Sequence, residues 1–371
     1  MSLRTVALDE LRRRRSEKWR KFPPDVLPSH IAEMDFGVAA AIEETLVSAG
    51  RAGDLGYAHA KSSGLADAFA TFAERRWKWG LDPANVVAVP DVMVGVAELL
   101  RVATPEGAGV VINPPVYPPF FSVIAETGRH VVEVPLDDGR LPLEGMREAL
   151  RDGASAVLLC NPQNPTGSVW SADDVRAVGE LAGERGALFL SDEIHAPLTL
   201  PGVTHVPAAT VAENAIVLTS ATKAWNLAGL KCGLAIGDRK LLARLPEGIH
   251  DRVGHLGILA SVAAYTRGGD WLDELRDYLA ETHQRLPHLL EQYAPGVRVT
   301  PAQATFLAWL DFRETALADD PAAAVLERGR LSLLPGTDFG DAGAGFARLN
   351  VGTSRELVEV AVRRIGRGLS R

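Results

Sequence analysis

A lysine at position 223 stands among small hydroxyl residues in the stretch "SATKAWNLAGLKCG", residues 220–233, which carries a second lysine at position 231. A lysine amine acts as a nucleophile toward a carbonyl carbon when its surroundings lower its pKa. Ser220 and Lys231 suit an anion such as a phosphate, because a hydroxyl donor and a cation both favour negative oxygen atoms. The stretch predicts either amine chemistry beside an anion or a solvated loop.

Two other stretches present polar groups next to apolar runs. In "CNPQNPTG", residues 160–167, Pro165 restricts Asn164 to an extended backbone. An asparagine held in this way can donate a hydrogen bond to a phenolate oxygen. In "SDEIH", residues 191–195, an apolar run ends at Asp192, where an unpaired buried charge would be costly. We therefore expect a buried cation to face Asp192.

The stretch "PPVYPPF", residues 114–120, holds Tyr117 between prolines as a flat aromatic surface. The sequence thus offers a carboxylate for a ring nitrogen, an amide for a ring oxygen, an aromatic platform, a phosphate cup and an amine nucleophile. These groups together suit one ligand, pyridoxal 5′-phosphate.

Four short apolar runs must position these groups, and they end at Asn113, Asn161, Asp192 and Ser220. Between the second and third run, helical spacing predicts a helix that is capped by Ser171, with Asp174 three residues later, and that stops near Gly186. Strand, helix and strand with continuous apolar strands indicate an α/β fold with a mostly parallel sheet. Ligands bind beyond the carboxyl ends of such strands, where these polar residues fall.

A different pattern follows residue 270. A helix is predicted from Trp271 to about Tyr293, and Pro287 should kink or interrupt it. Strands near "TFLAWLDF" and "ARLNVG", a helix over 322–328 and a closing helix from Arg355 complete an α+β unit. We expect a large cofactor-binding domain over 37–270 and a smaller domain built from 1–36 and 271–371.

Composition limits the classes of partner that the protein could bind and the compartments in which it could occur. The net charge of −8 argues against nucleic acid or an anionic membrane as the partner, and no run of about 18 apolar residues could span a bilayer. The start of the chain does not resemble a signal peptide. Cys160 and Cys232 are too few for a disulfide framework and lack metal-ligand spacing, so we expect no metal site and a cytoplasmic protein. The basic run over 12–15 is interpreted as a solvated helix face rather than an arm for an acidic partner.

The motifs resemble fold type I pyridoxal-phosphate enzymes, the aspartate aminotransferase superfamily. Within that superfamily they are similar to the MalY/PatB-type cystathionine β-lyases, also called C–S lyases. The resemblance covers most of the chain and depends on the order and spacing of several stretches, which are "IAEMDF", "GYAH", "PPVYPPF", "NPQNPTG", "SDEIH", "SATKAWNLAGLKC", "PGTDFG" and "RLNVG".

The resemblance implies a role for each candidate residue. Lys223 forms the internal aldimine, Asp192 pairs with the protonated pyridine nitrogen, and Asn164 contacts the ring hydroxyl oxygen. Tyr117 stacks on the ring. The phosphate is held by Ser220 and Lys231.

Four more residues follow from the resemblance. The helix that begins near Val92 and Met93 aims free N–H groups at the phosphate. Arg348 clamps the α-carboxylate of an amino-acid substrate with two hydrogen bonds. Tyr57 reaches the phosphate of the neighbouring subunit, which implies a homodimer with shared active sites.

Two positions depart from the family pattern, since many relatives carry Trp at the position of His30 and Gly at the position of Asp91. Asp91 can cap the helix, yet an acid beside a phosphate is unfavourable unless it points away. Each candidate also has a structural interpretation. Lys223 and Lys231 could be surface lysines and Asp192 the partner in an ion pair. Tyr117 could be a packed aromatic ring, and Ser220 could simply end a strand. His195 and His30 are interpreted as structural or rim residues.

The implied reaction is β-elimination, in which cystathionine or a related cysteine S-conjugate yields a thiol, pyruvate and ammonia. The alternative is an aminotransferase, since the same residues serve both reactions. A third hypothesis is a regulatory protein that keeps the cofactor site but acts through its surface.

Overall fold

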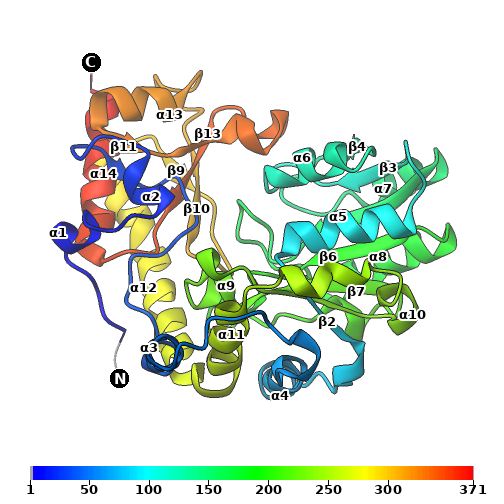
Figure 1. Ribbon diagram of the computed structural model, residues 1–371. Coiled ribbons are helices and arrows are strands. Elements are labelled where there is room, and N and C mark those ends of the chain that lie inside the picture. The colour runs from blue at the N-terminus through cyan, green and yellow to red at the C-terminus, as the bar shows by residue number, and fades with distance from the viewer. Residues whose placement is uncertain (1–2, 371) are drawn as a thin grey trace.

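The computed structural model of this chain describes residues 3–370. Its largest element is a seven-stranded sheet with strand order β2-β8-β7-β6-β5-β3-β4 (Figure 1). Strand β8 is antiparallel to both of its neighbours, and the other neighbouring pairs are parallel. The strands are Val86–Val89 (β2), Gly109–Ile112 (β3), His130–Glu133 (β4), Ala154–Cys160 (β5), Leu188–Asp192 (β6), Ala215–Thr219 (β7) and Gly233–Ile236 (β8). The predicted mostly parallel sheet is confirmed.

The central strands are apolar throughout because both of their faces are covered. In β3, Val110 and Val111 belong to different core clusters, and in β5 so do Val157 and Leu158. Successive side chains of a strand point to opposite faces of the sheet. A strand with helices on both faces therefore has an unbroken apolar run, as the sequence predicts.

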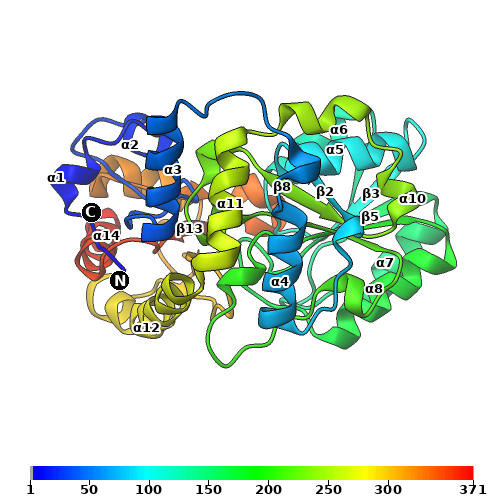
Figure 2. The ribbon, with the colours of Figure 1, turned by 60° about the horizontal axis from the view of Figure 1, so that its bottom comes forward.

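Helices flank the sheet on both faces. One core cluster includes residues of α5 (Val92–Ala103) and α6 (Pro119–Glu126). The other includes residues of α4 (Leu65–Trp77), α7 (Leu143–Arg151), α8 (Ala172–Glu184) and α11 (His255–Arg267). Helix α8 begins with the predicted capping box between Ser171 and Asp174. Helix α3 (Ala40–Ala52) packs beside α11 (Figure 2).

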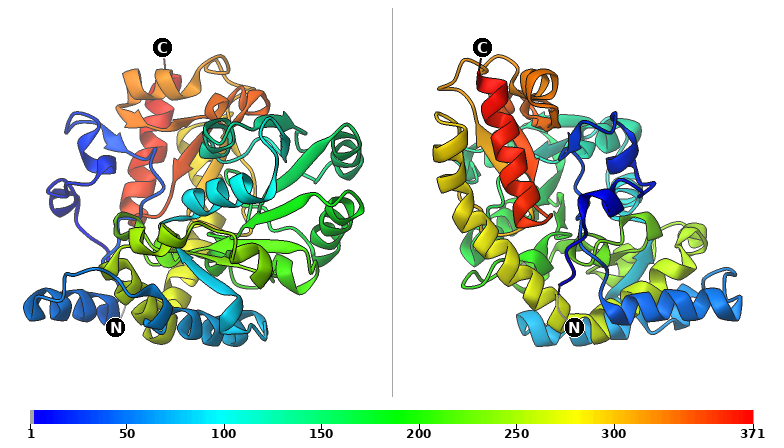
Figure 3. Two further views of the ribbon diagram at one scale, coloured as in Figure 1. Left: turned by 45° about the vertical axis from the view of Figure 1, so that its right-hand side comes forward. Right: turned by 90° about the vertical axis from the view of Figure 1, so that its left-hand side faces the viewer.

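A second sheet of four antiparallel strands lies beside the first (Figure 1). Its strands are Arg298–Val299 (β9), Leu307–Asp311 (β10), Leu334–Pro335 (β12) and Phe346–Asn350 (β13). Helices α12 (Gly269–Tyr293) and α14 (Arg355–Leu369) run side by side here (Figure 3). Helix α13 (Pro321–Ala324) continues as a π-helix, η7 (Val325–Gly329).

The N-terminal segment contains α1 (Leu8–Leu11), α2 (Glu17–Arg20) and β1 (Leu27–Pro28), which pairs in parallel with β11 (Leu331–Ser332). Its apolar side chains share a core cluster with α14 and the four-stranded sheet. The domain limits, 37–270 against 1–36 with 271–371, stay a prediction.

Short helices complete the chain. These are α9 (Ala221–Ala224), α10 (Arg239–Leu242), η1 (Ala60–Ser62), η2 (Pro83–Asn85), η3 (Ala196–Leu198), η4 (Ala208–Thr210), η5 (Ala228–Leu230), η6 (Glu247–Arg252), η8 (Gly336–Phe339) and η9 (Asp341–Gly343). Within residues 3–370, the structure contains no helix that combines the length and the apolar character needed to cross a membrane.

Helix α12 is not interrupted at Pro287 but continues to Tyr293, because the buried Leu286, Leu289 and Leu290 keep this turn packed although proline removes one backbone hydrogen bond. The alternative expectation, a kink at Pro287, stays a prediction. The basic run over 12–15 is not a helix face, since α1 ends at Leu11.

Candidate active site

A cavity of about 320 Å³ opens at the carboxyl ends of β5 and β6 and at the start of α5. Strand pairing sets Cys160, at the end of β5, beside Asp192, at the end of β6. Strand β7, the next neighbour, leads directly into α9. Seven of the predicted residues line this cavity, namely Val92, Met93, Tyr117, Asn164, Asp192, Lys223 and Lys231.

Asp192 supplies a buried carboxyl group at one side of the cavity. Its side chain is 2% exposed, and Oδ1 accepts a hydrogen bond of 3.1 Å from the main-chain N–H of Ile194. Burial raises the pKa of Asp192 to about 7, against the opposing effect of this hydrogen bond. A carboxyl group in this setting gains from a cationic partner such as a protonated ring nitrogen.

Lys223 presents its amine from α9. Its Nζ donates a hydrogen bond of 2.9 Å to the main-chain carbonyl of Ala32, which also lines the cavity. Burial lowers the pKa of Lys223 to about 8, and the positive charge of Arg348 lowers it further, whereas Asp192 opposes both effects. A larger fraction of this amine is therefore neutral and nucleophilic near pH 7 than for an ordinary lysine.

Asn164 and Arg348 form a buried pair. Nη1 of Arg348 donates to Oδ1 of Asn164 at 3.1 Å, and Nη2 donates to the carbonyl of His30 at 2.9 Å. Because its oxygen is engaged, the amide N–H group of Asn164 is the part that can serve a ligand in the cavity. Arg348 does not line the cavity, and its buried Nε has no partner among the described residues. Burial lowers the pKa of Arg348 to about 10.

The N-terminus of α5 also lines the cavity, through Asp91, Val92 and Met93. Asp91 caps this helix, since Oδ1 accepts from the N–H of Val94 at 2.8 Å, while Oδ2 lies 3.0 Å from Nζ of Lys231. Oδ2 therefore lies beside the cation that is predicted to hold the phosphate, and because Asp91 itself lines the cavity, it does not point away from the predicted phosphate position. Asp91 also competes for the same cation.

Ser220, the predicted phosphate ligand, and Thr222, two residues later, differ in location. The hydroxyl of Ser220 lies 2.6 Å from the carbonyl of Cys232, accepts from the N–H of Thr222 and does not line the cavity. Thr222 does line it. Thr222 was not among the predicted site residues, and its position directly before Lys223 is the signal in the sequence that points to it.

The two tyrosines differ in location. Tyr117 lines the cavity, with its ring edge-on to Phe120 at 5.9 Å, and burial raises its pKa to about 12. Tyr57 is 99% exposed on the segment after α3 and lies outside the cavity. One chain alone does not bring Tyr57 to the site.

Both histidines that were interpreted as structural or rim residues are buried. Nδ1 of His30 lies 2.8 Å from Oγ of Ser332, and Nδ1 of His195 lies 3.1 Å from Oγ1 of Thr305. Burial lowers their pKa values to about 4 and about 3, so both rings are neutral at pH 7. Only His195 lines the cavity.

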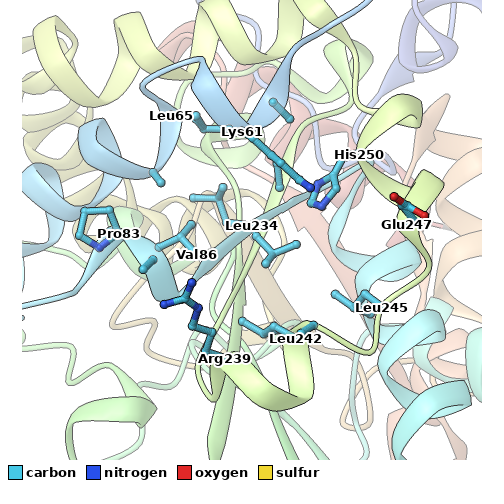
Figure 4. A pocket seen from close by; sticks show the side chains of 16 residues that line it. Lys61, Leu65, Pro83, Val86, Leu234, Arg239, Leu242, Leu245, Glu247 and His250 are labelled. Carbon is cyan, nitrogen blue, oxygen red and sulfur yellow. The ribbon is translucent and has the colours of Figure 1, made fainter.

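A larger cavity of about 730 Å³ lies over the edge strand β2 (Figure 4). Its polar groups, Lys61, Arg239, Glu247 and His250, surround an apolar floor. None of the predicted residues lines this cavity. The smaller cavity of about 320 Å³, which contains the predicted site residues, is therefore the candidate active site.

The groups present fit pyridoxal 5′-phosphate. A buried acid, an amine of lowered pKa, an amide donor and an aromatic ring line one cavity, and the start of α5 with Lys231 offers a place for a phosphate.

Comparison with known proteins adds the family. The chain is 38% identical to a cystathionine beta-lyase from Corynebacterium glutamicum, over 98% of this chain and 99% of that one. It is 34% identical to the cystathionine beta-lyase PatB from Bacillus subtilis, over 93% of each chain. A crystal structure of a proposed PLP-dependent beta-cystathionase from Corynebacterium diphtheriae matches with a TM-score of 0.96 at 34% identity, covering 100% and 99% of the two chains. The family model for aminotransferase class I and II matches residues 35–365, so the chain belongs to this family.

Proposed function

We propose that this protein is a pyridoxal-phosphate-dependent C–S β-lyase. It cleaves the bond between Cβ and sulfur in cystathionine or a related cysteine S-conjugate, and with one water the products are a thiol, pyruvate and ammonia. The observation that carries the proposal is that Lys223, Asp192 and Asn164 line a single cavity, in a chain whose relatives are named cystathionine beta-lyases.

Each residue would hold a different part of the cofactor. Lys223 would bind its aldehyde carbon, Asp192 its ring nitrogen and Asn164 its ring oxygen, while Tyr117 lies against the ring. Lys231 and the start of α5 would hold the phosphate. When bound, the cofactor accepts electrons from the substrate Cα.

The chain's own residues perform the remaining steps. Arg348 binds and orients the substrate α-carboxylate. Lys223 removes the proton from Cα, a task that suits an amine whose pKa is lowered to about 8. Asp192, which burial alone would keep protonated, holds the proton on the ring nitrogen and so stabilises charge that develops in the transition state. The electron pair from Cα then forms a double bond to Cβ, and the thiolate leaves with the electrons of the broken Cβ–S bond.

An aminotransferase is the second candidate, because the matching family model describes class I and II aminotransferases. In that reaction Lys223 would deliver the proton that it took from Cα to the cofactor, and the product would be a keto acid. The same side chains serve both reactions, so turnover without an amino acceptor is what separates them.

We also propose a homodimer in which Tyr57 completes the site of the partner. Tyr57, Leu55 and Val47 are large side chains with substantial exposure on or just after α3, which is typical of an interface. Cys160 and Cys232 are both free and buried, which supports a cytoplasmic location. Sedimentation equilibrium tests the dimer.

A direct assay tests the reaction. The purified protein with added cofactor should release pyruvate from cystathionine without any keto acid present, and the Lys223→Ala variant should release none. Pyruvate release that appears only when a keto acid is supplied would favour the aminotransferase.

A further inference from the structure

The segment over residues 30–36, here named the strap, passes over the catalytic lysine. Its carbonyl at Ala32 accepts the hydrogen bond from Nζ of Lys223 at 2.9 Å. Three residues after that lysine, Asn226 donates to the carbonyl of Met34 and accepts from its N–H, both at 2.8 Å. The strap is therefore hydrogen-bonded both to Lys223 itself and to Asn226, in the segment that follows the lysine.

A second set of contacts ties the strap to the four-stranded sheet. Nδ2 of Asn350 is 2.7 Å from the carbonyls of both Ile31 and Glu33. The N–H of Asp35 donates to the carbonyl of Gly352 at 2.8 Å. The strap thus links the part of the chain that carries Lys223 to the part that carries Arg348.

The third set of contacts comes from the N-terminal basic segment. Arg14 donates to the carbonyls of Met34 and Phe36 through its two terminal nitrogens, both at 3.1 Å. Lys18 is 1% exposed, and its Nζ lies 2.8 Å from Oδ2 of Asp35 and 2.9 Å from the carbonyl of Glu33. These contacts differ from those of a solvated basic run, because each cation binds the strap at two points.

We propose that Arg14 and Lys18 are positioning residues for Lys223: they fix the strap so that the Ala32 carbonyl meets the lysine amine. When the amine acts as the base, that carbonyl accepts one of its N–H groups and so orients the lone pair that takes the Cα proton. This inference rests on the proposed role of Lys223 as the base.

Packing alone would not require this arrangement. A segment that only covers a core can be held by apolar side chains, whereas here a guanidinium fork and a buried ion pair specify the position of main-chain carbonyls. An arginine fork fixes geometry as well as contributing energy, since its planar donors match two acceptors at once.

The basic run supplies its own matched control. Arg15 adjoins Arg14, carries the same charge and is exposed, and no contact of its side chain with the strap is recorded within residues 3–370. Arg14→Gln and Arg15→Gln therefore change the net charge equally, and only the first removes strap contacts. Arg14→Lys keeps the charge but cannot bind both carbonyls.

The test compares these variants as holoenzymes. Amide hydrogen exchange over residues 30–36 should accelerate about tenfold in Arg14→Gln and stay unchanged in Arg15→Gln. The kcat for pyruvate release should fall about 10- to 100-fold, and its pH midpoint should shift upward as water reaches Lys223. For Arg14→Lys, the exchange rate, kcat and the pH midpoint should lie between those of Arg14→Gln and those of the unaltered protein.

Exchange is measured independently of turnover, so failure of the lyase assignment would leave that result intact. If Arg14→Gln and Arg15→Gln match in exchange, kcat and pH midpoint, the positioning role is wrong. A loss of melting temperature with unchanged exchange and pH midpoint would also overturn it, because that pattern is purely structural. If Arg14→Gln does not fold, Arg14→Lys is compared with Arg15→Lys instead. Equal exchange, kcat and pH midpoint in these two variants would likewise show that the positioning role is wrong.

Discussion

Nη1 of Arg348 donates a hydrogen bond of 3.1 Å to Oδ1 of Asn164, a residue 184 positions earlier in the chain. The arginine that is proposed to bind the substrate carboxylate and the amide that is proposed to bind the cofactor ring are thus one hydrogen-bonded unit. A change at Arg348 should consequently affect both binding steps.

Replacing Arg348 with Lys should weaken substrate binding most. A lysine keeps the charge but cannot present two parallel donors to a carboxylate, so KM for cystathionine should rise about 10- to 100-fold. Arg313→Lys is the matched control, because Arg313 pairs with Asp311 in a surface salt bridge on the same sheet. Steady-state kinetics measure KM for cystathionine in both variants. Equal KM values would show that Arg348 does not bind the substrate carboxylate.

Asp192→Asn should abolish most turnover while leaving the cofactor bound. The asparagine cannot hold a proton on the ring nitrogen, so kcat should fall by about 10³-fold or more, a magnitude typical of lost charge stabilisation. Absorbance of the bound cofactor and the pyruvate assay measure the two effects separately. Near-normal turnover in this variant would contradict the assigned role.

The same substitution should stabilise the protein when the cofactor is absent. Burial raises the pKa of Asp192 from its ordinary 3.8 to about 7. The folded state therefore holds a proton that the unfolded state releases between these values, and this contribution to stability is lost as pH rises through about 7. At pH 8 the ionised acid opposes folding, so Asp192→Asn should increase the free energy of unfolding by on the order of 1–4 kcal/mol.

Thermal unfolding of the cofactor-free protein at pH 5 and pH 8 measures this effect. The gain in unfolding free energy of Asp192→Asn over the unaltered protein should be smaller at pH 5, where Asp192 is protonated in the folded state. Asp152→Asn, at an exposed position, provides the control. An equal advantage at both pH values would count against the raised pKa.

Lys223 should react at a lower pH than other lysines. Its pKa of about 8 means that the neutral amine, which is the reactive form, accumulates as pH rises through 8 rather than through the ordinary 10.5. The rate at which cofactor-free protein takes up pyridoxal 5′-phosphate should follow this midpoint. Exposed Lys240, labelled in parallel with an acylating reagent and mapped by mass, provides the comparison. Coincident midpoints for both lysines would refute the effect of burial.

Asp91→Gly should tighten the hold on the cofactor. Oδ2 of Asp91 lies 3.0 Å from Nζ of Lys231 and competes for it with a phosphate. Glycine is tolerated as a helix cap, so the loss of stability should be only a few tenths of a kcal/mol. The Kd for pyridoxal 5′-phosphate should fall several-fold, and more so at low salt.

Asp91→Asn separates charge from capping in this experiment, because asparagine caps the helix without the charge. It should reproduce the gain in affinity. A Kd that is unchanged in both variants would show that the acid does not oppose the phosphate.

Much of this arrangement could be predicted from the sequence, because the signals were local. Apolar runs that end in Asp192 or lead into Lys223 predict buried parallel strands with chemistry at one edge. Of the other residues of the cavity, Val92 and Met93 were expected only from the resemblance to a family. What could not be predicted depends on contacts between distant segments. Arg14 resembles any surface arginine until the fold brings it to the carbonyls of Met34 and Phe36.

A smaller error has a similar cause. Pro287 resembled a break, but buried leucines on both sides keep the helix intact. Tertiary packing here overrides a local preference. The role of Ser220 in holding the phosphate stays a prediction, and the carbonyl of Cys232 accepts its hydroxyl in this structure.

Borohydride reduction of the holoenzyme followed by mass mapping tests the central claim most directly. Reduction fixes the cofactor to the lysine that holds it, and we predict a cofactor-derived mass on Lys223 and on no other lysine. An adduct on Lys231 or elsewhere, or a protein that binds the cofactor without any covalent link, would contradict the account.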